Sequence, residues 1–132
     1  ASIHSRARID CPWNIEMGDF ASIGERAWIY SLEKIRIGRW SCVSQDVSLI
    51  TGTHDCCDPS FALITKPITI GEGVWLAFGA TVLPGITLHD YCVIGAGSIV
   101  TKDMPEMMVC AGNPCKAIKK RTIRSTGGWS QS

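Results

Sequence analysis

The chain has 132 residues, of which 45% are hydrophobic and 19% are charged, and its formal net charge is +1. This length suits a single domain with a continuous apolar core, and so small a net charge provides no strong field to attract nucleic acid or an anionic membrane. No apolar run reaches about 18 residues and no signal-peptide pattern is present, so we expect a soluble protein.

From the N-terminus onward, aliphatic residues recur with a period of six. They stand at Ile3, Ile9, Met17, Ile23, Ile29, Ile37, Val43 and Leu49, and again at Ile70, Leu76, Val82, Leu88, Ile94 and Val100. This period fits neither an amphipathic helix nor an ordinary strand, and it is typical of a parallel β-helix with one hexapeptide on each flat face of a triangular prism. Equivalent positions repeat every 20 residues in the first half and every 18 in the second. The earlier coils should therefore carry two extra residues at one corner.

The six-residue repeat is interrupted once, after Leu49, and resumes at Ile70. The break predicts an inserted loop at about 55–67, and loops that leave a rigid repeat scaffold commonly carry function. His54 precedes this loop and closes the last regular hexapeptide. A lone histidine is more often a surface residue than a catalyst, but a rigidly placed imidazole beside a loop suits a general base. We therefore expect residues 1–113 to form the β-helix and His54 to lie at its functional site.

The C-terminal segment, 114–132, begins with a basic stretch that contains Lys116 and Lys119. We interpret its start as a short helix that caps the prism and turns cations outward, followed by a frayed tail from 125 to 132. The seven cysteines show no CxxC spacing, and only Cys56 and Cys57 are adjacent. We expect reduced thiols, some of them buried as small hydrophobic residues, in a cytoplasmic protein.

Several motifs resemble one family. They are PWNIEMGD, the HD pair after ITGT, KPITIGEGVWLAFGA, IGAGSIVTKDMP and AGNPCKAIKKR. Together they are similar to the left-handed β-helix hexapeptide acyltransferases, and most of all to the acetyltransferases of colanic acid and exopolysaccharide gene clusters and to the maltose, galactoside and nodulation-factor acetyltransferases. The resemblance implies left-handed coiling, acetyl-CoA as co-substrate, no required metal, and a saccharide acceptor. It also implies a homotrimer with active sites between subunits, in agreement with the apolar surface that Trp28, Trp40, Trp75 and Phe78 would expose on a single prism.

The resemblance also assigns roles to residues. It implies that His54 is the general base of a direct acetyl transfer to a hydroxyl. The CoA contacts that it implies are Trp75, Phe78, Ala96, Thr101, Lys102, Lys116 and Lys119. Ser31 stands where relatives commonly have an asparagine near the transfer site, so Ser31 and Asp55 are the predicted acceptor contacts. Either Asp55 or Asp46 could orient the imidazole, or each could be a solvated corner residue.

Two other classes remain as alternatives. Gamma-class carbonic anhydrases use the same prism with three histidines on a metal, and this chain has three, His4, His54 and His89. Their positions in the repeats differ, so we expect His4 and His89 to be exposed corner residues that do not converge on one ion. A non-catalytic β-helix module is the second alternative, although a flat face of regular threonine rows, as ice binding would need, is missing from the sequence.

Overall fold

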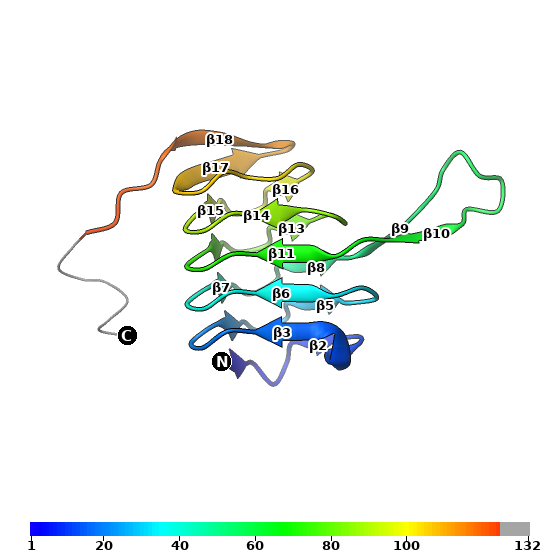
Figure 1. Cartoon of the computed structure of the whole chain (residues 1–132), viewed down its shortest axis with the longest axis horizontal. Helices are drawn as coiled ribbons and strands as arrows, with labels where there is room; N and C mark the ends of the chain where they lie inside the picture. Colours follow the sequence, from blue (N-terminus) through cyan, green and yellow to red (C-terminus); the bar gives the residue numbers. More distant parts are fainter. Residues whose placement is uncertain (125–132) are drawn as a thin grey trace.

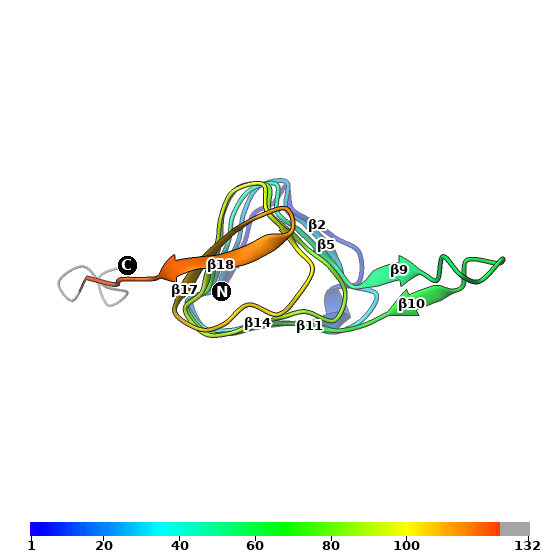
Figure 2. The ribbon, with the colours of Figure 1, turned by 90° about the horizontal axis from the view of Figure 1, so that it is seen from above.

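The computed structural model describes residues 1–124, most of which form a stack of coils (Figure 1) with a triangular cross-section (Figure 2). The tail expected at 125–132 lies outside the described residues. Apart from one short 3-10 helix, η1 (Pro12–Asn14), the regular elements of the described chain are strands. Among these residues no helix is long and apolar enough to cross a membrane.

Each flat side of the prism is one sheet. Face A contains β1 (Ser2–Ile3), β4 (Ser22–Ile23), β7 (Cys42–Val43), β12 (Trp75–Leu76), β15 (Val93–Ile94), β17 (Met108–Gly112) and β18 (Cys115–Lys120). Face B contains β2 (Arg8–Ile9), β5 (Trp28–Tyr30), β8 (Ser48–Ile50), β13 (Thr81–Val82) and β16 (Ile99–Val100). Face C contains β3 (Ile15–Met17), β6 (Ile35–Ile37), β11 (Ile68–Ile70) and β14 (Thr87–Leu88). Successive coils pair in parallel on all three faces.

The register confirms the two coil lengths that the sequence predicts. Ser22 pairs with Cys42, 20 positions later in the chain, whereas Trp75 pairs with Val93, 18 positions later. The path of the chain also confirms left-handed coiling. Followed upward in Figure 1, the coils run clockwise toward the viewer in Figure 2, which defines a left-handed screw.

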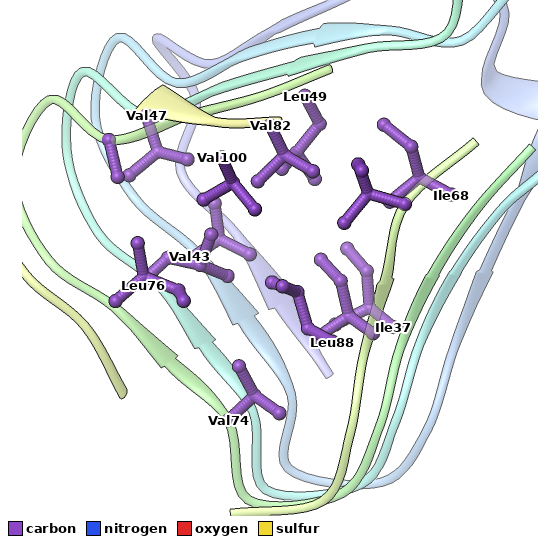
Figure 3. Close-up of a cluster of buried hydrophobic side chains, with 14 of the residues drawn as sticks. Ile37, Val43, Val47, Leu49, Ile68, Val74, Leu76, Val82, Leu88 and Val100 are labelled. Atoms are coloured by element: carbon purple, nitrogen blue, oxygen red, sulfur yellow. The ribbon is translucent and has the colours of Figure 1, made fainter. Parts of the chain in front are cut away.

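The repeated aliphatic residues fill the interior in columns. Leu49, Val82 and Val100 come from face B and point toward the same axis as Leu76 from face A and Leu88 from face C (Figure 3). All five side chains are fully buried. Because each coil covers the core of its neighbour, the stack shares one continuous core.

The coils approach each other closely at the corner between faces C and A. A Cβ atom on Gly38 would lie 2.4 Å from the carbonyl oxygen of Gly71 in the next coil. No side chain fits in that space, so the sequence needs glycine at this point in the repeat.

The insertion after Leu49 forms an ordered arm that leaves the corner between faces B and C. Strand β9 (Gly52–His54) pairs antiparallel with β10 (Leu63–Thr65), and the loop between them spans 55–62. Figure 2 shows the arm extending away from the prism. The arm therefore begins at Gly52, before His54, and not after it as the hexapeptide count suggested. Residues 66 and 67, which the expected loop at about 55–67 included, connect the arm back to face C.

The prediction of a short C-terminal helix is wrong. Cys115–Lys120 forms strand β18, which pairs antiparallel with β17 and lies across the end of the prism (Figure 2). Here the open edge of β17 offers backbone hydrogen-bond partners, and tertiary pairing of this kind overrides the local preference of a Lys- and Ala-containing segment for helix. Cys115 is buried and Lys116 to Lys120 are exposed.

Candidate active site

His54 is the last residue of β9, and its side chain is exposed on the arm. The Nδ1 atom lies 2.8 Å from the backbone carbonyl oxygen of Phe61. A carbonyl oxygen can only accept a hydrogen bond, so Nδ1 carries the proton and donates it in the neutral ring. The lone pair is therefore on Nε2, which is the tautomer that a general base acting through Nε2 requires.

The loop that carries Phe61 is held by its own hydrogen bonds. The backbone N–H of Phe61 donates to the carbonyl oxygen of Asp58 at 2.9 Å, and that of Asp58 donates to the carbonyl oxygen of Asp55 at 3.2 Å. Hydrogen bonds from the backbone and side chain of Ser60 hold the pKa of the Asp58 carboxyl below its usual range. The loop thus fixes the carbonyl group that orients the imidazole.

Neither candidate carboxylate orients the imidazole. The Asp55 carboxylate accepts the backbone N–H of Cys57 at 3.0 Å. The Asp46 carboxylate accepts two hydrogen bonds from the Arg26 guanidinium, at 2.9 and 2.8 Å, which lower the pKa of this carboxyl. The imidazole is instead hydrogen-bonded to the backbone carbonyl oxygen of Phe61. A main-chain carbonyl leaves no signal in sequence, so Phe61 could not have been found from residue type.

A hollow of about 410 Å³ lies at the base of the arm. Its lining comprises Ile50, Gly52, Thr53, Ile64, Lys66, Leu83, Pro84 and Thr101. Thr101 follows β16, so the structure brings this predicted CoA contact to the corner from which the arm projects. Lys102 follows directly and is exposed.

Other predicted CoA contacts lie elsewhere on the prism. Trp75 is on face A, where its side chain is 45% exposed and its indole N–H donates to Ser44 Oγ at 3.0 Å. Phe78 occupies the turn between faces A and B and is 52% exposed. Ala96 lies in the turn one coil above, where Gly97 N–H donates to the Phe78 carbonyl oxygen at 2.9 Å. These three residues therefore share one stretch of surface.

Lys116 and Lys119 are exposed on β18, where they pair with Ala111 and Val109 of β17. They lie on a strand that crosses the end of the prism beside β17, and not on the expected helix. The predicted CoA contacts thus form two groups, with Thr101 and Lys102 near the corner between faces B and C that also carries the arm with His54, and the other five on or beside face A or on β18. Face A does not meet the corner from which the arm leaves, so one chain does not bring His54 to Trp75.

Ser31 corrects a further expectation. Its side chain is fully buried, and its hydroxyl donates to the carbonyl oxygen of Cys11 at 2.9 Å while accepting the N–H of Cys11 at 3.1 Å. At the equivalent place one coil later, Thr51 Oγ1 donates to the carbonyl oxygen of Tyr30 at 2.6 Å. These hydroxyls join coils at the corner that holds the two extra residues. Ser31 is a structural residue and does not contact an acceptor.

The other two histidines are exposed, as expected, and are remote from His54 in the stack. The Nδ1 atom of His4 accepts the backbone N–H of Arg6 at 3.0 Å in the first coil, and His89 follows β14 near the other end. Among residues 1–124, no three His, Cys, Asp or Glu side chains are grouped so that they could hold a metal ion.

Comparisons with known proteins agree with this architecture. Residues 67–102 match the family described as bacterial transferase hexapeptide (six repeats). The chain is 41% identical over 119 residues to WcaF of Escherichia coli (strain K12), a predicted colanic acid biosynthesis acetyltransferase, with 90% of this chain and 65% of WcaF covered. The chain spans between 57% and 65% of the length of such curated relatives.

Two solved structures support the same relationship. A maltose O-acetyltransferase from Clostridium difficile 630 superposes with a TM-score of 0.84 at 34% identity, covering 92% of this chain and 67% of that one. A galactoside acetyltransferase in complex with coenzyme A superposes with a TM-score of 0.79 at 30% identity, covering 92% of this chain and 65% of that one. The chain therefore belongs to the hexapeptide-repeat acetyltransferase family, whose left-handed parallel β-helix it shares.

Proposed function

We propose that the protein is an acetyl-CoA-dependent O-acetyltransferase that acts on a hydroxyl group of a saccharide, with His54 as the general base. The observation that carries this proposal is the 2.8 Å hydrogen bond between His54 Nδ1 and the Phe61 carbonyl oxygen. It presents Nε2 of an exposed imidazole as a proton acceptor on an ordered arm. The related maltose and galactoside enzymes indicate the class of acceptor.

The reaction needs no covalent intermediate on the enzyme. His54 Nε2 takes the proton of the acceptor hydroxyl as the oxygen attacks the thioester carbonyl carbon. The new C–O bond forms, the C–S bond breaks, and the CoA thiolate leaves with the electron pair and receives the proton from the imidazolium. The products are the acetyl ester and free CoA.

We propose acetyl-CoA as the acetyl donor because a related enzyme binds coenzyme A and because this chain exposes side chains that suit its parts. The galactoside acetyltransferase was solved with coenzyme A bound. In this chain the exposed Trp75 and Phe78 offer apolar surface to a pantetheine arm, and Lys116 and Lys119 offer ammonium groups to phosphates. Thr101 and Lys102 are the CoA contacts proposed at the corner between faces B and C.

We further propose that the sites lie between subunits of a homotrimer. The proposed donor residues and His54 occupy separate parts of one prism, so a neighbouring chain is needed to combine them. The arm also exposes Phe61 and Leu63, at 61% and 55%, which is apolar surface that a neighbouring subunit could cover.

Thiol release from acetyl-CoA over a panel of mono- and oligosaccharides tests the activity. We expect His54→Ala to lower kcat by about 10²- to 10⁴-fold, the usual contribution of a general base. His89→Ala is the matched control because His89 is also exposed but lies on another part of the stack. Unchanged transfer by His54→Ala would contradict the mechanism.

Mixed assemblies test the location of the site. Co-expressed His54→Ala and Trp75→Ala chains should recover about a quarter of the wild-type sites if each site takes one residue from each of two subunits at random. Light scattering should report three chains per particle. Failure of the mixture to exceed either variant alone would exclude a site shared in this way.

A further inference from the structure

Two adjacent cysteines, Cys56 and Cys57, lie in the loop that joins the two strands of the arm. Both carry free thiols and both are exposed, whereas the other five cysteines of the chain are buried or half-buried. The loop stands clear of the prism in two perpendicular views (Figures 1 and 2). Small reagents in solution therefore reach this pair of thiols more readily than the remaining ones.

The two cysteines occupy the centre of a β-turn that begins at Asp55 and ends at Asp58. The backbone N–H of Asp58 donates to the carbonyl oxygen of Asp55 at 3.2 Å, and that of Cys57 donates to an Asp55 carboxylate oxygen at 3.0 Å. The peptide bond between the cysteines is trans, and neither of them has a positive φ. The turn therefore depends on the present backbone dihedral angles of Cys56 and Cys57.

A second turn connects this geometry to the imidazole. The backbone N–H of Phe61 donates to the carbonyl oxygen of Asp58 at 2.9 Å, so Asp58 ends the first turn and begins the second. The carbonyl oxygen of Phe61 in turn accepts the hydrogen bond from His54 Nδ1. A change in the first turn therefore displaces the group that orients His54.

A disulfide between the two cysteines does not fit the present turn. Neighbouring Cα atoms across a trans peptide are about 3.8 Å apart, whereas disulfides usually join Cα atoms that are about 4.4–6.8 Å apart. Closing the ring must therefore change the dihedral angles of both cysteines, which frees the Asp58 N–H from Asp55. Because such a bond departs from the usual disulfide geometry, thiols reduce it readily.

We infer that Cys56 and Cys57 form a reversible modification site for low-molecular-weight disulfides, and that their oxidation displaces the carbonyl group that orients His54. The thiolate of one cysteine attacks the small disulfide, forms a mixed disulfide and releases one small thiol. The thiolate of the other cysteine then attacks the protein sulfur of that mixed disulfide and releases the second small thiol. The two cysteines lose two electrons and two protons in total, and the small disulfide gains them.

The effect of this modification on catalysis rests on the proposed function, whereas the modification itself does not. None of the residues of the arm belongs to the buried core of the described chain. Oxidation of the loop should therefore leave the stack of coils intact and act on the proposed base alone. Acetyl transfer should stop under oxidising conditions and resume after reduction.

Oxidation of the assembled protein with 2-hydroxyethyl disulfide tests the modification. Mass spectrometry should show the loss of two hydrogen atoms from the peptide that contains both cysteines. Cys57→Ser is the matched variant because it keeps a side chain of similar shape but cannot close the ring, so it should retain the small thiol on Cys56. Cys42→Ser, which alters a half-buried thiol of face A, is the control and should be oxidised like the wild type. A wild type that keeps both hydrogens, retains the small thiol or becomes cross-linked between chains would overturn the inference.

Nitrogen-15 NMR of the imidazole tests the link to His54 without any measurement of activity. In the reduced wild type, at a pH where the ring is neutral, the proton should reside on Nδ1. Oxidation should raise the share of the form with the proton on Nε2, and dithiothreitol should reverse this change. Cys57→Ser should show the reduced spectrum before and after treatment. An unchanged spectrum of the fully oxidised wild type would disprove the link.

Mass spectrometric detection of the acetylated saccharide measures the effect on catalysis. We expect oxidation to lower kcat about tenfold or more, without a change in KM for acetyl-CoA, and dithiothreitol to restore kcat to within about twofold. If no saccharide is acetylated but the imidazole spectrum still responds to oxidation, the proposed function fails and the modification site remains. If the reduced protein is active and full oxidation leaves kcat unchanged, the inference fails and the proposed function remains.

Discussion

His54 and Phe61 are joined across the loop of the arm by a 2.8 Å hydrogen bond from imidazole Nδ1 to a backbone carbonyl oxygen. Phe61 has a φ of 51°, a left-handed conformation that aims its carbonyl group back at the imidazole. The orientation of the proposed base is thus decided by main-chain geometry seven residues later in the sequence.

Substitution of Phe61 can test this relationship while leaving His54 in place. Phe61→Gly keeps the carbonyl group and suits a positive φ, so kcat should stay within a few-fold of wild type. Phe61→Pro forbids this φ and removes the N–H that bonds Asp58, so kcat should fall about tenfold or more while KM for acetyl-CoA is unchanged. Steady-state kinetics measure both. Equal activity in the two variants would show that the Phe61 carbonyl does not position the base.

The shared core predicts a large effect of truncating one column residue. Leu76 is fully buried, and Leu76→Ala should lower the free energy of unfolding by about 2–5 kcal/mol through lost burial and the cavity left behind. Ile118→Ala, at a position that is 62% exposed, is the control and should change stability by less than about 0.5 kcal/mol. Urea titrations at one fixed protein concentration compare them. A small loss for Leu76→Ala would mean that the neighbouring coils collapse into the space.

Arg121 links the last strand to two earlier coils. Its guanidinium donates to the carbonyl oxygens of Gly73 and Tyr91, at 2.9 and 3.1 Å. Arg121→Met keeps the apolar stem but leaves these contacts unmade, so we expect a loss of about 1–3 kcal/mol and faster hydrogen exchange in β17 and β18. Lys120→Met, at an exposed neighbouring position, should leave the exchange rates unchanged. Matching exchange rates in both variants would contradict a role for Arg121 in holding β18.

The buried Cys92 thiol predicts a loss of stability in alkali. Burial, as the largest cause, raises the pKa of this thiol from 9.0 to about 12. Above pH 9 the unfolded chain loses the Cys92 proton while the folded chain keeps it, so the stabilising contribution is complete below pH 9 and declines as the pH rises toward 12. The slope should reach at most about 1.4 kcal/mol per pH unit for this group.

Unfolding midpoints between pH 7 and 11 measure that slope. The slope should be shallower in Cys92→Ala than in wild type, whereas Cys56→Ala, at an exposed position of the arm, should match wild type. Parallel curves for wild type and Cys92→Ala would remove Cys92 as the cause.

The coils could be predicted from sequence because every repeat places the same kind of residue in the same environment. Ile23, Val43 and Leu76 each face the interior from face A, so the period in sequence is also the period in space. The segment 115–120 lacks such a period. Its structure depends on the free edge of β17, a long-range partner that local composition does not reveal.

The candidate site can be predicted from the sequence only in part, for similar reasons. A single long break in a regular repeat points to His54, whereas the group that orients it is a carbonyl that any residue at position 61 could supply. Ser31 is assigned to the acceptor from its position, where relatives commonly have an asparagine, and the residue type alone does not tell whether its hydroxyl faces solvent or another coil. Only the stacking of coil on coil shows that its hydroxyl is used by Cys11.

Strand β18 also decides how long the stack can grow on face A. A solenoid of parallel strands has no intrinsic length, since each new strand leaves an edge like the one that it covered. The antiparallel β18 presents the opposite strand direction at this edge, with the ammonium groups of Lys116, Lys119 and Lys120 on the same strand. Such an edge disfavours pairing with another copy of the chain, so we expect this end of the protein to resist end-to-end polymerisation into fibres.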